Sequence, residues 1–354
     1  MVCQNKSNYQ YELDILRTFA CFLVIWQHVT ECYYIKPGFS VTNNSDTYII
    51  GWINSLTPIE VPLFVMISGY FLLPLKTDIN QFFKKRVLRV VYPFVVWCII
   101  HALYYAVTRG DSVQDVIINI LHIPVNFGTE IGHMWFIYMI LGLYLLTPII
   151  SPWLEQCSKK QLQGYLFLWA FTNCLPYIHL FFPAILGECF WNPSPMLYYF
   201  TGFAGYYILG FYIKRYGTLS SGKSILLVII GYLVTVSIYQ YRIGKVDSVS
   251  DLELCWRFCA INISAMAFGI FSLIKNIHWR KNGITTRFIA DCSSKSYAIY
   301  FIHLMVVFCL YPIINQFGMP IYINIPLITT ACFISSYVII SVLYLIPKIN
   351  KIIG

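Results

Sequence analysis

Apolar runs long enough to cross a lipid bilayer recur from one end of the chain to the other. The hydrocarbon core of a bilayer is about 30 Å thick, so a helix needs about 20 mostly apolar residues to span it. The pattern predicts an all-α, polytopic membrane helix bundle. It indicates ten spans, at 13–34, 48–74, 87–108, 133–153, 161–182, 196–213, 223–241, 255–275, 296–314 and 320–346.

Two stretches depart from this simple pattern. The run at 161–182 is weak because Asn173 and Pro176 interrupt it. The segment 112–123, SVQDVIINILHI, is amphipathic and too short to span, so we place it at the outer interface.

The N-terminus lacks the features of a cleaved secretory signal peptide, so we expect the first span to remain in the mature protein. We expect a single membrane domain over residues 1–354, without an added soluble domain.

Composition and charge support a membrane protein and give its orientation. The chain is 58% hydrophobic and only 11% charged, whereas an ordinary soluble domain carries about 25% charged residues. If the N-terminus is cytoplasmic, 19 of the 24 lysine and arginine residues fall on the cytoplasmic side, as the positive-inside rule requires. We therefore expect both termini to be cytoplasmic. The net charge of +9 needs no nucleic-acid partner.

The twelve cysteines are scattered through the predicted spans. They form no CxxC pair and no histidine–cysteine spacing typical of a metal site. We interpret most of them as small apolar side chains in helix packing. The sequence therefore predicts neither a disulfide framework nor a bound metal.

The first span, which contains LRTFACFLVIWQHVTE, carries ionisable residues that are costly in lipid. Ten residues separate Arg17 from His28, so on a helix both side chains project from nearly the same face, about 16 Å apart along the axis. Asp14 and Glu31 lie three residues from Arg17 and His28, respectively, within reach on one helix face. This pattern indicates one wall of a site that crosses much of the bilayer. The alternative is an interfacial ion pair and a histidine hydrogen-bonded in the bundle.

The third span begins with FFKKRVLRVVYP, a basic cluster at its cytoplasmic end. Arg86 and Arg89 are three residues apart at a helix N-terminus, next to Lys84 and Lys85. The planar guanidinium group suits phosphate oxygens, and the helix dipole adds favourable potential there. The alternative is a cluster that only attracts anionic lipids.

Other polar residues inside or at the ends of spans are candidates for substrate contact: His133, His303, Glu60, Trp135 and Ser68. Trp135 is also explained as an interfacial anchor, and His303 as a donor in a helix–helix hydrogen bond. Gly69, next to Ser68, would permit close approach of two helices.

Four stretches occur in an order that resembles the membrane acyltransferase-3 family: LDILRTFACFLVIWQH, VPLFVMISGYFL, HMWFIYMILGLYLLTP and SYAIYFIH. These are bacterial inner-membrane enzymes that O-acylate surface sugars. The similarity covers nearly the whole chain. It is strongest to the stand-alone members, the group that includes the O-acetyltransferases of enterobacterial common antigen.

The resemblance implies functional roles for residues already singled out. The arginine and histidine of the family's first span match Arg17 and His28, and its basic R-x-x-R motif matches Arg86 and Arg89. It implies an acyl-CoA donor, most simply acetyl-CoA, that enters from the cytoplasm, and a sugar or lipid-linked glycan acceptor whose hydroxyl group is activated by a histidine. Acyl transfer needs a base, donors for the oxyanion and a grip on the donor's phosphates. We assign His28 as general base with Glu31 and Arg17 in support, and Arg86, Arg89, Arg17 and Lys85 to the donor.

Two other classes of protein share parts of this pattern. A small-molecule transporter also has inward-facing ionisable residues and proline-interrupted spans, and some membrane domains of this family are linked to amino-acid uptake. A scaffold of an envelope assembly would use the same polar groups for helix packing. Consumption of acetyl-CoA distinguishes the enzyme from the transporter.

Overall fold

The computed structural model describes residues 9–125, 132–182, 197, 200–279 and 283–354. The chain is 79% helical. Its two short strands, β1 (Ile35–Lys36) and β2 (Ser40–Val41), form an antiparallel hairpin after the first helix. The α-helices are α1 (Tyr11–Tyr34), α2 (Ser45–Asn54), α3 (Glu60–Leu72), α4 (Ile79–Arg86), α5 (Tyr92–Arg109), α6 (Val113–His122), α7 (Trp135–Gln156), α8 (Lys159–Thr172), α9 (Leu175–Phe181), α10 (Ala204–Tyr216), α11 (Ser221–Arg242), α12 (Val249–Leu252), α13 (Ile261–Asn276), α14 (Ile284–Asn315) and α15 (Ile321–Leu343).

Seven helical segments of the described chain are long and apolar enough to cross a membrane: Tyr11–Tyr34, Ser45–Leu72, Ile79–Arg109, Gly132–Gln156, Ser221–Arg242, Ile284–Asn315 and Ile321–Leu343. An eighth is present if Val249–Trp256 and Ile261–Asn276, which meet at a bend of 42°, form one span. The protein is therefore an all-α, multi-pass membrane protein, as the sequence predicts. The predicted count of ten spans is not confirmed.

The difference arises in two predicted spans. The run 161–182 folds as α8 and the seven-residue α9, separated at Asn173 and Cys174. The run 196–213 begins partly outside the described residues and contains α10, a helix of 13 residues. At 1.5 Å per residue α10 is about 20 Å long, shorter than the hydrocarbon core. Hydropathy alone does not detect where a helix stops.

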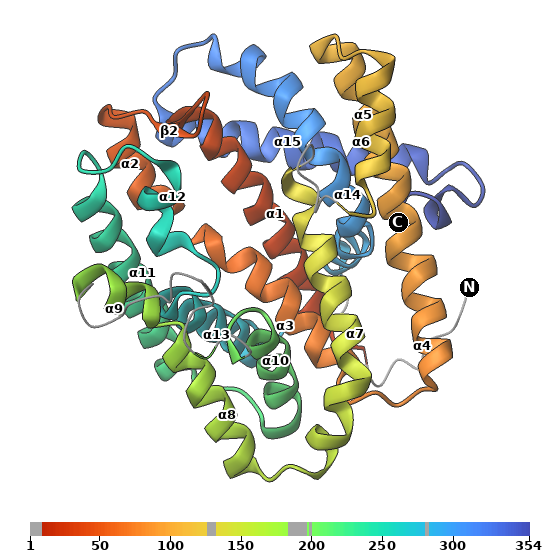
Figure 1. Cartoon of the computed structure of the whole chain (residues 1–354), viewed down its shortest axis with the longest axis vertical. Coiled ribbons are helices and arrows are strands. Elements are labelled where there is room, and N and C mark those ends of the chain that lie inside the picture. Colours follow the sequence, from red (N-terminus) through yellow and green to blue (C-terminus); the bar gives the residue numbers. More distant parts are fainter. Residues whose placement is uncertain (1–8, 126–131, 183–196, 198–199, 280–282) are drawn as a thin grey trace.

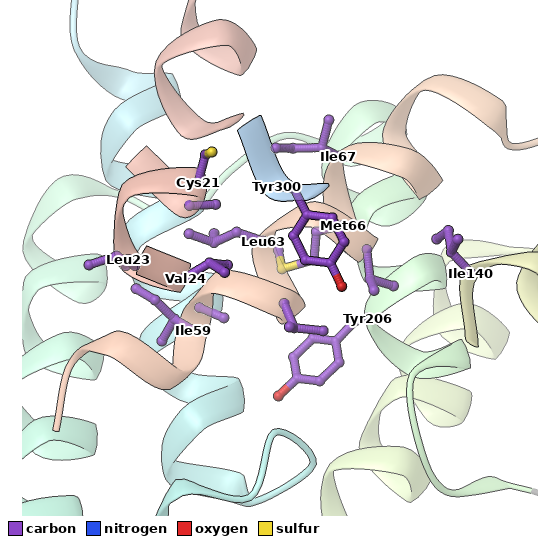
Figure 2. Packing of buried hydrophobic residues seen from close by; sticks show 14 of the residues in the cluster. Cys21, Leu23, Val24, Ile59, Leu63, Met66, Ile67, Ile140, Tyr206 and Tyr300 are labelled. Atoms are coloured by element: carbon purple, nitrogen blue, oxygen red, sulfur yellow. The ribbon is translucent and has the colours of Figure 1, made fainter. Parts of the chain in front are cut away.

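The first helix lies at the centre of the bundle, beside α3 and α14 (Figure 1). It packs against α14, α3 and α15, so the two ends of the chain meet around it. Figure 2 shows part of the core there, where Cys21 and Val24 of α1 lie near Leu63 and Met66 of α3, with Tyr300 reaching in from α14. This arrangement buries one face of α1 and leaves its polar residues beside cavities.

Close backbone contact joins α3 to α10. A Cβ atom on Gly69 would lie 1.8 Å from the carbonyl oxygen of Tyr207, and one on Gly210 would lie 2.0 Å from that of Met66. Both glycines therefore face the backbone of the partner helix, as small residues do where membrane helices approach closely. The close approach expected at Gly69 from the sequence is present.

We expect Gly69→Ala to destabilise the protein by about 1–3 kcal/mol or more, because the added methyl group meets backbone atoms that cannot move without separating the helices. The matched control is Gly142→Ala in α7, where an added Cβ meets nothing within 4 Å. That change should leave stability unchanged or raise it by up to about 1 kcal/mol. Thermal unfolding in detergent measures both. Equal melting temperatures for the two variants would contradict this account of the α3–α10 contact.

Candidate active site

Two cavities lie along α1, one beside each of its functional candidates. The larger, of about 680 Å³, is called here the histidine cavity; its polar lining includes Gln27, His28, Glu31, Glu60, His133, Ser250, Glu253, Arg257 and Tyr300. The smaller, of about 360 Å³, is called the arginine cavity; its polar lining is Arg17, Ser68, Arg86, Arg89, Tyr144, Ser293, Ser294, Ser296, Tyr297 and Tyr300. The spacing of Arg17 and His28 on one helix therefore places them in adjacent cavities.

The His28 imidazole is oriented by a carboxylate on the same helix. Its Nδ1 lies 2.7 Å from Oε2 of Glu31. Because a carboxylate only accepts hydrogen bonds, Nδ1 carries the proton, and Nε2 of the neutral ring holds a free lone pair. Gln27 contacts the other oxygen of Glu31 through Nε2 at 3.4 Å. The pair has the arrangement of a general base and its orienting acid.

The Gln27 side chain connects this pair to the next helix. Its carbonyl oxygen accepts hydrogen bonds from Nδ2 of Asn54 and from the hydroxyl of Thr57, both at 2.8 Å. Asn54 and Thr57 are themselves buried. The polar network therefore fixes the histidine end of α1 against the segment between α2 and α3.

Two further carboxyl groups face the histidine cavity. Glu60, the first residue of α3, is only 2% exposed, and its Oε2 has no hydrogen-bond partner among the described residues. Glu253, in the short helical turn Glu253–Trp256 before α13, accepts a hydrogen bond from the hydroxyl of Tyr34. A buried polar atom without a partner is costly, so Glu60 is placed to accept a hydrogen bond from a molecule that enters the cavity.

Aromatic side chains cover one wall of the same cavity. The Trp135 ring stacks on Phe258, with centroids 5.4 Å apart and planes at 25°, and it lies 5.7 Å from Phe203. All three residues line the cavity. Aromatic faces beside hydrogen-bonding groups form a surface suited to ring-shaped, hydroxylated molecules. Trp135 therefore lies in the cavity wall and not only at an interface.

Three histidines from three other helical segments, His101, His133 and His303, form a cluster with His28. The ring of His28 lies 5.3 Å from His303 and 6.4 Å from His133, and His133 lies 5.1 Å from His101. Nδ1 of His303 faces the carbonyl oxygen of Tyr300, so this nitrogen carries the proton and Nε2 does not. Neither ring nitrogen of His133 has a hydrogen-bond partner among the described residues.

This difference separates His133 from His303, the two histidines that the sequence indicates as candidates for substrate contact. A neutral His303 offers only a lone pair at Nε2, whereas a neutral His133 can present an N–H donor. No set of three or more His, Cys, Asp or Glu side chains in the described chain has the geometry to hold a metal ion.

The arginine cavity holds three guanidinium groups from two helices. Arg17 lies 3.6 Å from the carboxylate of Asp14 and donates to the hydroxyl of Ser293 at 3.0 Å, and Ser293 in turn donates to Asp14. Arg86 and Arg89 form no ion pair with a carboxylate in the described part of the chain. Two positive charges are therefore available at the cavity for an anion.

The chain around these two arginines is locally irregular: Arg86 ends α4, and Arg89 lies in the turn that follows. Val87–Val91 forms a π-helical turn between α4 and α5, a rare feature that is frequent at functional sites. The guanidinium carbon of Arg86 lies 5.6 Å from the ring centroids of both Phe82 and Tyr144, and its buried Nε has no partner in the described chain. The aromatic rings hold the side chain, and its Nε donor remains unused.

Lys85 lies apart from Arg89. It lines a third, smaller cavity of about 200 Å³, together with Lys76 and Lys214. Arg86 lines both this cavity and the arginine cavity. Ser68 also lies apart from the other candidates for substrate contact, because it lines the arginine cavity and donates its hydroxyl to the carbonyl of Phe64.

The structure also brings to the cavities, or next to them, residues that sequence reasoning did not single out. His101 and Glu253 are ionisable residues within or next to predicted spans, so the cost of burying such groups was a signal for both. Phe136 and Tyr300 line both large cavities. Nothing in the sequence distinguishes these two aromatic residues from the many others in the spans.

The fold and the paired cavities define a multi-pass helical membrane protein with two adjacent polar cavities inside its helix bundle. The family model described as an acyltransferase domain, acyltransferase-3, matches residues 10–345. The chain therefore belongs to the membrane acyltransferase-3 family. Comparison with curated proteins and with solved structures gives no significant match.

Proposed function

We propose that the protein is an O-acyltransferase of the bacterial inner membrane that moves an acetyl group from acetyl-CoA to a hydroxyl group of a surface glycan or lipid-linked sugar. Membership of the acyltransferase-3 family supports acyltransferase activity in general. The observation that carries the finer proposal is the pair of adjacent cavities, one with uncompensated arginines and one with the His28–Glu31 pair.

The proposed reaction assigns a step to each of these groups. Nε2 of His28 accepts the proton of the acceptor hydroxyl, whose oxygen attacks the thioester carbonyl carbon. The new C–O bond forms and the C–S bond breaks, and the proton passes to the departing thiolate to give free CoA. Glu31 holds the His28 ring in the tautomer that this step needs. His133 is better placed than His303 to donate a hydrogen bond to the oxyanion, because the N–H group of His303 already donates to the backbone carbonyl of Tyr300.

The two substrates then occupy different cavities. Arg86 and Arg89, with Arg17, hold the phosphates of the donor at the cytoplasmic end predicted from the charge distribution. Glu60, Trp135 and the neighbouring aromatic wall bind the acceptor in the histidine cavity. In this arrangement donor and acceptor meet at the cavity boundary, close to His28.

The test is the release of free thiol from acetyl-CoA by the purified protein, with and without an envelope extract that contains lipid-linked glycans. We expect thiol release that depends on the extract, with labelled acetate recovered in the glycan fraction. A transporter would instead move its substrate into vesicles without consuming acetyl-CoA. Intact acetyl-CoA in the presence of a folded protein and the extract would contradict the proposal.

A further inference from the structure

Phe136 and Tyr300 form the boundary between the histidine cavity and the arginine cavity. They are the two residues that line both. Their rings meet edge to face, with centroids 5.7 Å apart and planes at 63°. Phe136 lies in the first turn of α7 and Tyr300 in the middle of α14, so this boundary joins two helices that are far apart in the sequence.

The two rings are held to different degrees. The Tyr300 hydroxyl donates to the carbonyl oxygen of His133, and its ring packs 5.6 Å from Phe301 and 5.8 Å from His303. Its side chain is therefore fixed at both ends. Phe136 is only partly buried and is held by ring contacts alone, with its centroid 6.0 Å from Phe64 and 6.4 Å from Trp135. The Phe136 ring, which has no hydrogen bond to anchor it, is consequently the less constrained side of the boundary.

The proposed reaction requires the acyl end of the donor to cross this boundary. The donor's phosphates bind in the arginine cavity, whereas the base lies in the histidine cavity, so the end of the donor that carries the acyl group passes between the two rings. Because the acyl group is at the end of the donor that enters, it is the first part of the donor to contact the two rings. Beyond them the histidine cavity is the larger of the two, at about 680 Å³ against 360 Å³. The size of the acyl group is therefore limited by the boundary between the two rings and not by the volume of the histidine cavity behind it.

We propose that Phe136 and Tyr300 form the passage through which the donor's acyl group reaches His28, and that its width restricts the donor to short acyl groups. The inference rests on the proposed acyl-CoA-dependent function and specifies its donor. It makes Phe136 a specificity-determining residue, because shortening this side chain widens the passage while the phosphate and base sites stay unchanged.

The experiment compares acetyl-CoA with butyryl-CoA in the thiol-release assay, for the wild type, Phe136→Ala and Phe136→Trp. Each extra methylene group in a confined apolar site changes a rate by about tenfold or more, and butyryl-CoA carries two more than acetyl-CoA. We therefore expect the wild type to prefer acetyl-CoA by about 100-fold or more and Phe136→Ala to lose about tenfold or more of that preference. Phe136→Trp should slow transfer from acetyl-CoA by about tenfold. Its dissociation constant for acetyl-CoA, measured by calorimetry, should stay close to the wild-type value.

Phe203→Ala is the matched control, since Phe203 lines only the histidine cavity. It should leave the butyryl-to-acetyl ratio unchanged. Phe136→Leu provides a milder variant if either of the others does not fold. An unchanged butyryl-to-acetyl ratio in Phe136→Ala and Phe136→Leu would overturn the proposed passage. So would a Phe136→Trp protein that loses acetyl-CoA binding and acyl transfer to the same extent. A wild type that turns over neither thioester would instead overturn the proposed function itself.

Discussion

Replacing His28 by alanine is expected to slow acyl transfer by about 100- to 10,000-fold, the range typical of a lost general base. The expectation rests on one feature of the structure. Glu31 fixes the proton on Nδ1 of His28, so Nε2 is left free beside the histidine cavity. Binding of acetyl-CoA should be nearly unchanged, because the arginines that hold its phosphates lie in the other cavity. The thiol-release assay and calorimetry measure the two quantities separately.

Two comparisons separate catalysis by His28 from a loss of structure. Imidazole added to His28→Ala should restore part of the rate, since a small base can enter the emptied site. His101→Ala removes another buried imidazole of the same cluster, one that does not line the cavity, and should keep most of the activity. Full activity of a folded His28→Ala protein would remove the histidine from the mechanism.

Glu31→Gln should fall between these variants. The amide preserves the size of the side chain but removes its charge, and its NH₂ group can face Nδ1 as a donor. In that case the ring proton moves to Nε2 and the base is lost in part of the population. A rate equal to that of the wild type would show that the His28–Glu31 contact has no role in the reaction.

The parts of the site that depend on helix period could be predicted from the sequence. The eleven-residue step from Arg17 to His28 fixes both on one face of any regular helix, and α1 is regular throughout. The same reasoning brings Glu31 to His28, since three residues along a helix give adjacent side chains. These are local consequences of backbone geometry, so they do not depend on how the rest of the chain packs.

The parts that depend on tertiary packing could not be predicted. His101, His133 and His303 lie on separate helical segments, and no spacing indicates that they meet around His28. The contact between Phe136 and Tyr300 is still harder to predict from the sequence, because the chain contains 26 phenylalanines and 28 tyrosines. At 161–182 the sequence showed the interruption at Asn173 and Pro176, and the helix divides there, but hydropathy alone still indicated one span.

The double substitution Arg86→Ala/Arg89→Ala is expected to weaken acetyl-CoA binding by about 100-fold or more, because a hydrogen bond to a charged group contributes about 1.5–3 kcal/mol and two such groups are removed. Both arginines line the arginine cavity, and no carboxylate of the described chain pairs with either of them. Their charges are therefore free to bind phosphate. Calorimetry with purified wild-type and variant proteins measures the change.

The matched control is Lys84→Ala/Arg287→Ala, which removes two positive charges from exposed positions that line none of the cavities described above. If the arginines act by direct contact, this control keeps the wild-type affinity. If the basic cluster only supplies a diffuse potential or attracts anionic lipid, both double variants lose affinity to the same extent, and the loss disappears at high salt. Local binding therefore requires a difference between the two variants that persists at high ionic strength. Equal affinities of the two double variants for acetyl-CoA would mean that Arg86 and Arg89 only attract anionic lipid, and the donor would then bind elsewhere in the chain.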